Sequence, residues 1–440
     1  MPELRKELTL FGLIMVAIGA SIGSGIFVTP AEIAKELHTP SLIGVVWILG
    51  GVITLTGALT FAELGSMFPK AGGIYVYLRE AYGELVAFLY GWTMLTVTTT
   101  ASIAGLALAF AKYINHIFPL GYDGILYVAI AAIVVVTFIN LFGVKLSENF
   151  SSTFTTLKII GILLVIGVGV FAYFMVGNNT FQQSVETANA PNNLSSAFAV
   201  ALISVLFSYG GWQHASFLAG ETKNAAQVIP KAMVFGALSI IFIYLLINFA
   251  YLSLLPIQKI ESSQAIASDA LGQVIGKKGS YLIAILIAIS TFGTMSIYTL
   301  STPRIYYAMA QDGLFFKSLS KLHPTYHTPA NAILVQSIWA ICLLLLWGTF
   351  EKLITYVVFV DWIFFFLAAA SIYIFRKRKA DTERSYKTLG YPITPFIFLA
   401  IVAWFVINTL IEKPVQSVAG LALLLAGVPL YYYFKRGKKG

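Results

Sequence analysis

Eleven stretches of at least 21 consecutive residues contain no Asp, Glu, Lys or Arg. A helix needs about 20 mostly apolar residues to cross the hydrocarbon core of a bilayer, so each stretch is long enough to span a membrane. A twelfth stretch, residues 353–375, is interrupted by one charge, Asp361. The runs are continuous and do not alternate with polar residues as membrane β-strands do. The chain is therefore predicted to be an all-α membrane protein with 12 transmembrane helices.

The composition agrees with this interpretation. Apolar residues make up 58% of the chain and charged residues 11%, whereas soluble domains have about 45–50% and about 25%. Too little charge is present to cover a soluble fold of this size, and too much apolar side chain is present for a disordered chain. The first stretch is too long and too rich in glycine for a cleaved signal peptide. The helices are expected at residues 8–36, 41–68, 84–113, 123–141, 147–176, 195–221, 230–255, 278–307, 328–348, 352–375, 391–411 and 415–434.

The basic residues are distributed unevenly along this topology. The net charge is +9. If both termini are cytoplasmic, 20 Lys and Arg residues fall in the inner loops and tails and 7 in the outer segments, with Lys158 inside a predicted helix. This is the positive-inside pattern, so the charge indicates orientation and not nucleic-acid binding. The single cysteine, Cys342, lies in an apolar run and permits neither an internal disulfide nor a cysteine zinc site.

Glycine clusters interrupt two of the predicted helices near their midpoints. Residues 19–25 read Gly-Ala-Ser-Ile-Gly-Ser-Gly, and residues 207–212 read Phe-Ser-Tyr-Gly-Gly-Trp. Such clusters permit close packing of helices through small residues, and they also favour local unwinding of a helix. The two clusters fall in helices 1 and 6, the corresponding first helices of two five-helix halves. Paired broken helices in corresponding positions point to the substrate site of a transporter.

Breaks of this kind expose backbone groups of opposite character. After the first break, the N–H groups of residues 24–26 begin a half-helix and suit a carboxylate. Before the second break, the carbonyls of residues 207–209 end a half-helix and suit an ammonium group. An anion site beside a cation site matches the zwitterionic main chain of a free amino acid. The sequence therefore predicts an amino acid transporter whose substrate contacts are mostly backbone.

Four motifs in order identify a resemblance to a known family. They are Gly-Ser-Gly-Ile-Phe-Val-Thr-Pro at residues 23–30, the stretch from Ala62 to Tyr75, the second glycine cluster, and residues 302–313, Thr-Pro-Arg-Ile-Tyr-Tyr-Ala-Met-Ala-Gln-Asp-Gly. From about residue 8 to its C-terminal tail, the chain resembles the L-amino acid transporter family of the amino acid–polyamine–organocation superfamily. It is most similar to the bacterial serine/threonine and alanine–serine–cysteine exchangers.

The resemblance implies a LeuT-type fold with two inverted five-helix repeats and two added helices. The repeats would cover residues 8–176 and 195–375, and the added helices residues 391–434. Members of the family are sodium-independent amino acid exchangers without a cofactor or metal. Ser24 and Gly25 would then contact the substrate carboxylate, and Phe207 would also act as the outer gate. The substrate-binding residues implied are Ile22, Ser24, Gly25, Ile26, Phe207, Ser208, Gly210 and Tyr244.

The chain departs from the family at two points. Animal members bond to a heavy-chain glycoprotein through a cysteine between helices 3 and 4, but residues 115–124 contain no cysteine. No disulfide-linked partner is expected, and the protein is predicted to function as a monomer. The second departure is Asp361, where relatives often carry a neutral polar residue.

Ionisable residues inside a membrane are costly and usually functional. The resemblance places Lys158 where sodium-coupled relatives bind a cation. Its ammonium group is expected to donate to the carbonyl of Gly19 or Ala20 and to a hydroxyl in helix 8, with Ser290 as the candidate. Burial of this lysine leaves proton coupling as an alternative.

Three other ionisable residues in the predicted helices have expected roles. Glu63 is expected to form a structural ion pair beside Lys70 and Arg79, and Arg304 to anchor the inner end of its helix. His214 is a candidate for either the substrate pocket or ordinary packing.

The sequence thus predicts a sodium-independent antiporter of small neutral L-amino acids (alanine, serine, threonine and cysteine) that works by alternating access in a bacterial plasma membrane. A proton-coupled amino acid symporter on the same fold is the alternative. An enzyme is excluded because no nucleophile or metal-ligand spacing occurs. A channel is disfavoured because no ring of charged residues is present to line a pore.

Overall fold

The computed structural model describes residues 3–175, 191, 193–347 and 351–437, and the prediction of an all-helical fold is confirmed in these residues. One isolated backbone bridge joins Leu8 to Thr222. The helices are α1 (Leu10–Ser21), α2 (Gly25–Leu37), α3 (Pro40–Met67), α4 (Ile74–Tyr82), α5 (Glu84–Thr93), η1 (Met94–Thr98), α6 (Thr99–Ile117), α7 (Gly121–Leu141), α8 (Val144–Met175), α10 (Leu194–Tyr209), α11 (His214–Phe217), η2 (Ala219–Glu221), α12 (Ala225–Leu254), α13 (Ile257–Ser262), α14 (Ile266–Ile275), α15 (Lys277–Ser301), α16 (Pro303–Gln311), η3 (Lys317–Ser320), α17 (Ala330–Trp347), α18 (Glu351–Arg378), α19 (Ile393–Glu412), α20 (Pro414–Leu425) and α21 (Gly427–Gly437).

Most of these helices have the length and hydropathy of membrane spans. Within the described ranges, nine segments meet both conditions, and ten do if the bent pair α1 and α2 forms one span. Two expected spans fall short. α10 stops after 16 residues because a glycine pair follows it, and the apolar helix Ala330–Leu346 is shorter than the nine. The count of 12 spans stays a prediction.

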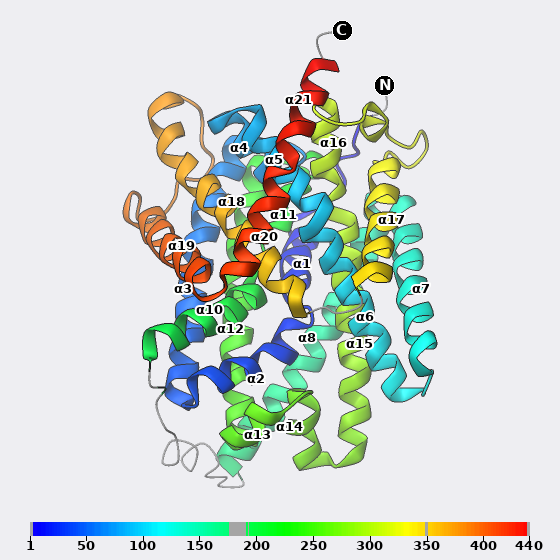
Figure 1. The fold of residues 1–440 in the computed structure, drawn as a ribbon, viewed down its shortest axis with the longest axis vertical. Helices are drawn as coiled ribbons and strands as arrows, with labels where there is room; N and C mark the ends of the chain where they lie inside the picture. The colour runs from blue at the N-terminus through cyan, green and yellow to red at the C-terminus, as the bar shows by residue number, and fades with distance from the viewer. Residues whose placement is uncertain (1–2, 176–190, 192, 348–350, 438–440) are drawn as a thin grey trace.

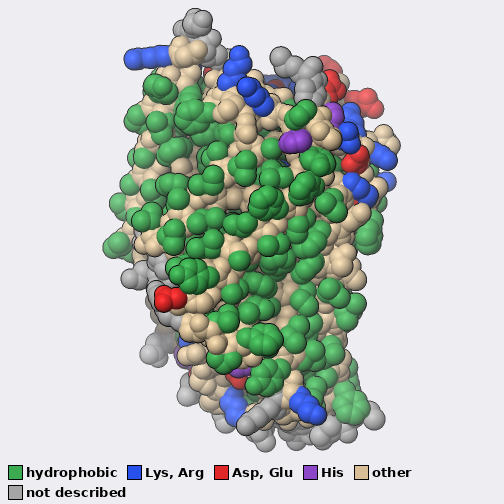
Figure 2. Space-filling view, turned by 90° about the vertical axis from the view of Figure 1, so that its right-hand side faces the viewer, with side chains coloured by type: hydrophobic (Ala, Val, Ile, Leu, Met, Phe, Trp, Pro, Cys, Tyr) green, Lys and Arg blue, Asp and Glu red, His purple; other side chains and the backbone are tan. Residues whose placement is uncertain are grey.

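The surface of the bundle is that of a protein embedded in lipid. Figure 2 shows apolar side chains over the broad middle of one face, with Lys, Arg, Asp and Glu gathered towards the two ends. Large side chains such as Phe174 and Val415 leave 72% and 73% of their surface exposed. Contiguous apolar surface of this kind marks contact with a membrane or a partner, and the span lengths favour the membrane.

The broken helices lie at the centre of the bundle. α1 packs against α8, α12 and α15, and α10 packs against α2 and α3. Figure 1 shows both chain termini at the same end of the bundle, together with α16 and α21, whereas α13 and α14 lie at the opposite end. We call the end that carries the termini the basic end, because the basic segment 376–390 also lies there.

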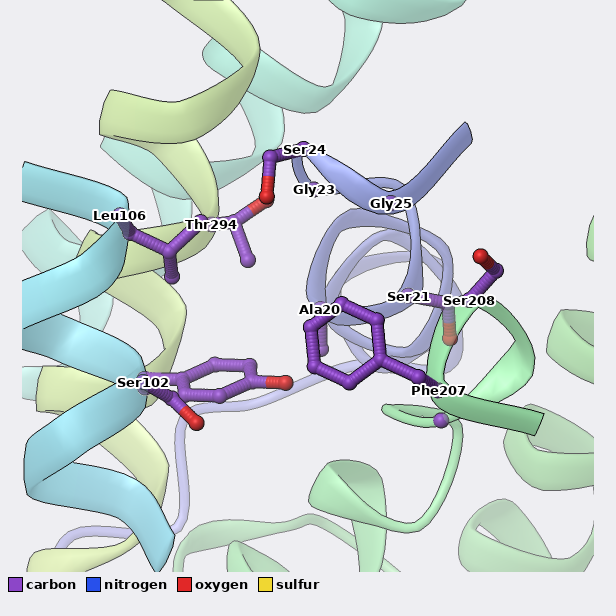
Figure 3. A pocket seen from close by; sticks show the side chains of 12 residues that line it. Ala20, Ser21, Gly23, Ser24, Gly25, Ser102, Leu106, Phe207, Ser208 and Thr294 are labelled. Atoms are coloured by element: carbon purple, nitrogen blue, oxygen red, sulfur yellow. The ribbon is translucent and has the colours of Figure 1, made fainter. Parts of the chain in front are cut away.

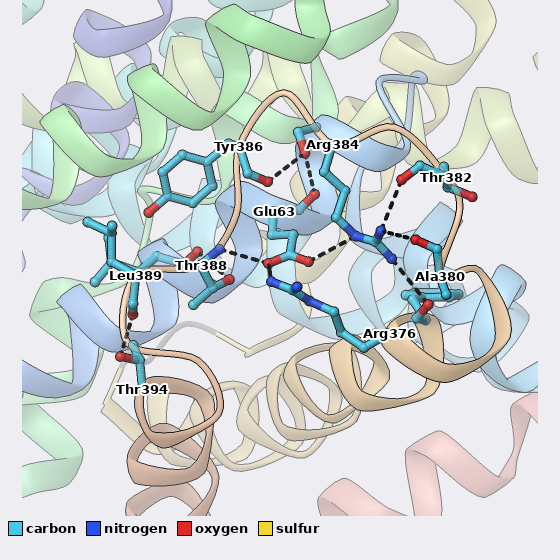
Figure 4. Close-up of polar contacts among 12 residues, drawn as sticks. Glu63, Arg376, Ala380, Thr382, Arg384, Tyr386, Thr388, Leu389 and Thr394 are labelled. Carbon is cyan, nitrogen blue, oxygen red and sulfur yellow. Dashed lines mark hydrogen bonds and ion pairs between the residues drawn. The ribbon is translucent and has the colours of Figure 1, made fainter.

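At the basic end, a polar network ties this segment to α3 (Figure 4). Glu63 is fully buried, and its Oε2 accepts hydrogen bonds from Arg376 Nη2 at 2.8 Å and from the Thr388 N–H at 2.7 Å. Arg384 Nε lies 3.1 Å from Glu63 Oε1, so the Glu63 carboxylate forms ion pairs with two arginines. The partners of Glu63 are therefore not Lys70 and Arg79, as expected, but arginines more than 300 residues away in the chain.

Arg79 and its neighbour Glu80 join other helices at this end. Arg79 pairs with Asp312, which also accepts a hydrogen bond of 2.7 Å from the Tyr75 hydroxyl. Glu80 Oε2 accepts a hydrogen bond of 2.8 Å from Lys379 Nζ. This bond and the nearby Arg79 hold the pKa of Glu80 below its ordinary value, since both favour the ionised carboxylate.

The most deeply buried ion pair at the basic end joins Arg304 to Glu221. Arg304 Nε and Nη2 donate to the two carboxylate oxygens at 2.7 and 2.8 Å, and both side chains are buried. The backbone carbonyl of Glu221 accepts from the N–H groups of Glu7 and Leu8, each at 3.0 Å. The pair therefore links α16, the end of η2 and the N-terminal segment.

We expect Arg304→Met to destabilise the protein by about 3–5 kcal/mol, because it leaves the Glu221 carboxylate buried without a cation. The double variant Arg304→Met/Glu221→Met removes both charges and should recover most of the loss. Thermal unfolding of the purified protein in detergent measures both effects. A single variant as stable as the parent would show that the ion pair contributes nothing to the stability of the protein.

Candidate functional site

The first glycine cluster forms a break between α1 and α2. α1 ends at Ser21, α2 begins at Gly25, and the two helices are bent by 40° at the intervening residues. Three glycines within seven residues weaken the helix here, because glycine is disfavoured in a helix interior. The last carbonyls of α1 and the first N–H groups of α2 have no partner inside their own helices. The break therefore presents both kinds of backbone group at the centre of the bundle.

The N–H groups that open α2 remain available for a ligand. Those of Ser24, Gly25 and Ile26 donate to no carbonyl of the described chain. Ser24 and Gly25 line a cavity, whereas Ile26 does not and its side chain is fully buried. The start of a helix carries partial positive charge, so this part of the cavity suits a carboxylate.

The carbonyls that close α1 are held by Lys158 of α8. Its Nζ donates to the Gly19 carbonyl at 3.0 Å, to the Ile22 carbonyl at 2.8 Å and to Thr294 Oγ1 at 2.8 Å. Lys158 is 1% exposed, and in the described parts of the chain no carboxylate pairs with it. Three neutral oxygens thus satisfy the three donors of the ammonium group.

Of the contacts expected for Lys158, the one with Gly19 is present, but the hydroxyl comes from a different residue. Thr294 of α15 takes the place expected for Ser290, which lies one turn earlier in the same helix. Ser290 Oγ instead lies 3.0 Å from the Ile22 carbonyl and 3.3 Å from that of Gly23. Lys158, Thr294 and Ser290 together hold the end of α1 from two helices.

The second glycine cluster forms a break after α10. This helix ends at Tyr209, and Gly211 has a φ of +126°, which favours glycine. A Cβ atom on Gly211 would lie 2.5 Å from the Ser21 nitrogen and 2.6 Å from the Ala20 carbonyl carbon. The backbones of the two breaks therefore pass so close together that only glycine fits between them.

Tyr244 of α12 connects the same two breaks. Its hydroxyl group lies 2.8 Å from the Ser21 carbonyl and 3.0 Å from the Ser208 carbonyl. Tyr244 is fully buried and does not line the cavity. The resemblance implies a substrate-binding role for this tyrosine, and the structure puts its hydroxyl between the broken helices.

A cavity of about 40 Å³ lies between the breaks and helices α6 and α15. This volume holds roughly three water molecules. Figure 3 shows the Phe207 ring projecting from α10 into the space between α1 and α6. The lining residues are Ala20, Ser21, Gly23, Ser24, Gly25, Ser102, Leu106, Phe207, Ser208, Gly210, Thr294 and Tyr298.

Some of the residues expected in the site line the cavity, and others do not. Expected residues that line it are Ser24, Gly25, Phe207, Ser208 and Gly210. Those that lie outside its lining are Gly19, Ile22, Ile26, Lys158, Tyr244 and Ser290. Sequence reasoning missed Ser102, Leu106, Thr294 and Tyr298, which come from unbroken helices. Their spacing at 102 and 106, and at 294 and 298, follows one face of a helix, but many other faces share that spacing.

The chemistry of this cavity is that of binding. No charged side chain lines it, and no group of three or more His, Cys, Asp or Glu residues that could hold a metal ion occurs in the described residues. It offers unpaired N–H groups on one side and a helix end with carbonyl groups on the other. These features suit a small molecule with separate negative and positive ends.

Comparison with known proteins identifies the family. The family model described as amino acid permease matches residues 8–431. The chain belongs to the amino acid permease family. It is therefore a member of the amino acid–polyamine–organocation superfamily and a membrane transporter, not an enzyme.

This permease is similar to characterised exchangers and transporters over almost its entire length. It is 34% identical to the serine/threonine exchanger SteT of Bacillus subtilis, over 99% of this chain and 98% of that protein. It is 30% identical to the large neutral amino acids transporter small subunit 2 of Rattus norvegicus, over 98% of this chain and 80% of that protein. It is 29% identical to the human b(0,+)-type amino acid transporter 1, over all of this chain and 90% of that protein.

Proposed function

We propose that this permease is a sodium-independent antiporter that exchanges small neutral L-amino acids by alternating access. The observation that carries the proposal is the Lys158 ammonium group, held by the Gly19 and Ile22 carbonyls and Thr294 at the first break. A bound cation in this place would use the same carbonyl and hydroxyl oxygens. The protonated lysine supplies a positive charge there, so no sodium ion is required to hold α1 against α8 and α15.

The substrate contacts proposed are backbone groups at the two breaks. The N–H groups of Ser24 and Gly25 bind the carboxylate, and carbonyls at the end of α10 bind the amino group. The one proton of the Tyr244 hydroxyl is shared between the Ser21 and Ser208 carbonyls, and the carbonyls of Phe207 and Gly210 are proposed as the main acceptors. The Phe207 ring closes the site towards the outside.

The proposed substrate class follows from the cavity and from the relatives. The cavity is small and has no charged side chain, and one relative is named a serine/threonine exchanger. Alanine, serine, threonine and cysteine are the proposed substrates. Cationic amino acids are proposed to compete poorly.

The proposed architecture has 12 spans in a LeuT-type arrangement. The first repeat covers residues 8–176, the second residues 195–375, and residues 391–434 supply the last two helices. The distribution of basic residues favours a cytoplasmic position for both termini, and the similarity to a Bacillus protein favours a bacterial plasma membrane. Cys342 is the single cysteine and lies in α17, so we propose a monomer without a disulfide-linked subunit.

Proton-coupled symport is the second candidate. It is favoured by Lys158 and Asp361, two ionisable residues in helices that match predicted spans. A symporter would accumulate substrate in response to a proton gradient, whereas an exchanger requires an amino acid on the opposite side.

Reconstitution into proteoliposomes separates these functions. We expect labelled serine to enter vesicles preloaded with serine and to stay out of empty vesicles, with equal rates in sodium and potassium buffers. Uptake stimulated by sodium would contradict the proposal. Uptake into empty vesicles driven by an inward proton gradient would assign the protein to the symporters.

A further inference from the structure

A second cavity adjoins the proposed substrate cavity. Its volume is about 60 Å³, which corresponds to roughly five water-sized groups. Ser102, Phe207, Gly210 and Tyr298 line both cavities, so a ligand in the first can extend into the second. The second cavity differs in having a carboxyl group, Asp361 of α18, in its wall.

Asp361 lies in the middle of the apolar helix α18. Its Oδ1 is buried and has no hydrogen-bond partner, and among the residues described in the structure no Lys, Arg or His forms an ion pair with it. A buried polar atom without a partner costs free energy, and such atoms are few in native proteins. An acceptor left open beside a cavity indicates that a ligand completes it.

Thr98 provides the complementary open group. It lines the second cavity at the margin of hydrogen-bonding distance from the Asp361 carboxyl group, and its buried Oγ1 has no partner that meets full hydrogen-bond geometry. Thr98 ends the π-helical turn η1, which also brings Met94 into the cavity wall. π-Helical turns within α-helices are frequent at functional sites.

Two other polar side chains of this cavity already have partners. Gln213 Oε1 accepts a hydrogen bond of 2.9 Å from the Gly211 N–H. His214 Nδ1 lies 2.6 Å from Ser301 Oγ, and the imidazole ring stacks on Tyr298 with centroids 4.3 Å apart. Asp361 Oδ1 and Thr98 Oγ1 are the fully buried side-chain atoms in the described lining of this cavity that lack a hydrogen-bond partner.

We propose that the second cavity receives the side chain of the substrate and that Asp361 accepts a hydrogen bond from a hydroxyl group on it. A hydroxyl group is both a donor and an acceptor, so one such group satisfies the Asp361 acceptor and the Thr98 donor together. This inference rests on the proposed amino acid exchange and assigns its specificity to Asp361.

The inference predicts a preference between amino acids of matched size. In counterflow with labelled alanine, the concentration of serine that halves the exchange should be at least about tenfold lower than that of alanine. The corresponding concentration of threonine should be at least about tenfold lower than that of valine. One hydrogen bond to a carboxylate accounts for a difference of this size. Asp361→Leu should reduce both ratios to about twofold or less while alanine exchange continues. Asp361→Asn should retain the preference, because its amide oxygen accepts the same hydrogen bond.

Asp381→Asn is the matched control, since Asp381 is an exposed carboxylate outside the helices, and it should leave both ratios unchanged. Equal competition by serine and alanine in the parent protein would overturn the inference but not amino acid exchange. This comparison needs no variant, so it decides the matter even if Asp361→Leu fails to fold. Competition by lysine that matches serine and is lost in Asp361→Asn would also overturn it, because the cavity would then hold a cation. Absence of exchange with every amino acid would overturn the proposed function itself.

Discussion

Replacing Lys158 by alanine is expected to reduce transport by at least about 100-fold while the protein still folds. The ammonium group donates to the Gly19 and Ile22 carbonyls, and each hydrogen bond from a charged donor contributes about 1.5–3 kcal/mol. Their loss removes the charged contact between the end of α1 and α8, and only the hydroxyl groups of Thr294 and Ser290, both on α15, then remain to hold these carbonyls. Because the proposed substrate contacts lie on the other side of the break, external affinity should change less than the rate. Counterflow rates and competition curves in proteoliposomes separate the two quantities.

Lys112→Ala is a suitable control for this variant. Lys112 is an exposed lysine near the end of α6 and forms none of the ion pairs found among the described residues, so its removal should leave transport close to the parent level. Thr294→Val tests the remaining contact, because it removes the Lys158 acceptor at nearly constant volume. A moderate loss, smaller than that of Lys158→Ala, is expected. If Lys158→Ala transports as fast as the parent, the charge at the break has no role in exchange.

The positions of the helices could be predicted because the bilayer sets the length of an apolar span. The expected range 41–68 corresponds to α3, Pro40–Met67, and the range 230–255 to α12, Ala225–Leu254. The two breaks could also be predicted, because glycine clusters act locally through helix propensity. The end of α1 at Ser21 and of α10 at Tyr209 follows from residues that are neighbours in the sequence.

Contacts between distant segments could not be predicted in the same way. Ser290 and Thr294 both present a hydroxyl group on one face of α15, and the register of α15 against α8 decides which of them meets Lys158. Glu63 shows the same limit. Lys70 is near it in the sequence, but the chain after α18 folds back and brings Arg376 and Arg384 instead. Packing of helices selects these partners, and no local pattern in the sequence encodes it.

The second large effect is expected from Gly25→Leu, which should abolish substrate binding. Gly25 opens α2 and lines the cavity, and its N–H can approach a carboxylate because no side chain intervenes. A Cβ atom here would lie 2.9 Å from Ser208 Oγ and 3.2 Å from Ser208 Cα. The leucine side chain would therefore push apart the two segments that are proposed to bind the opposite ends of the substrate. Binding of labelled serine to the purified protein in detergent measures the loss directly.

Gly44→Leu is the matched control for Gly25→Leu. Gly44 lies in the membrane-spanning helix α3, and a Cβ atom there meets nothing within 4 Å, so the same substitution adds the same bulk without a clash. It should leave serine binding and thermal unfolding close to those of the parent. Gly25→Ala adds the contact with Ser208 but little volume inside the cavity, and an intermediate affinity is expected for it. Normal affinity in a folded Gly25→Leu variant would mean that the carboxylate is bound elsewhere, because no amino acid can reach the α2 N–H groups past a leucine at this position.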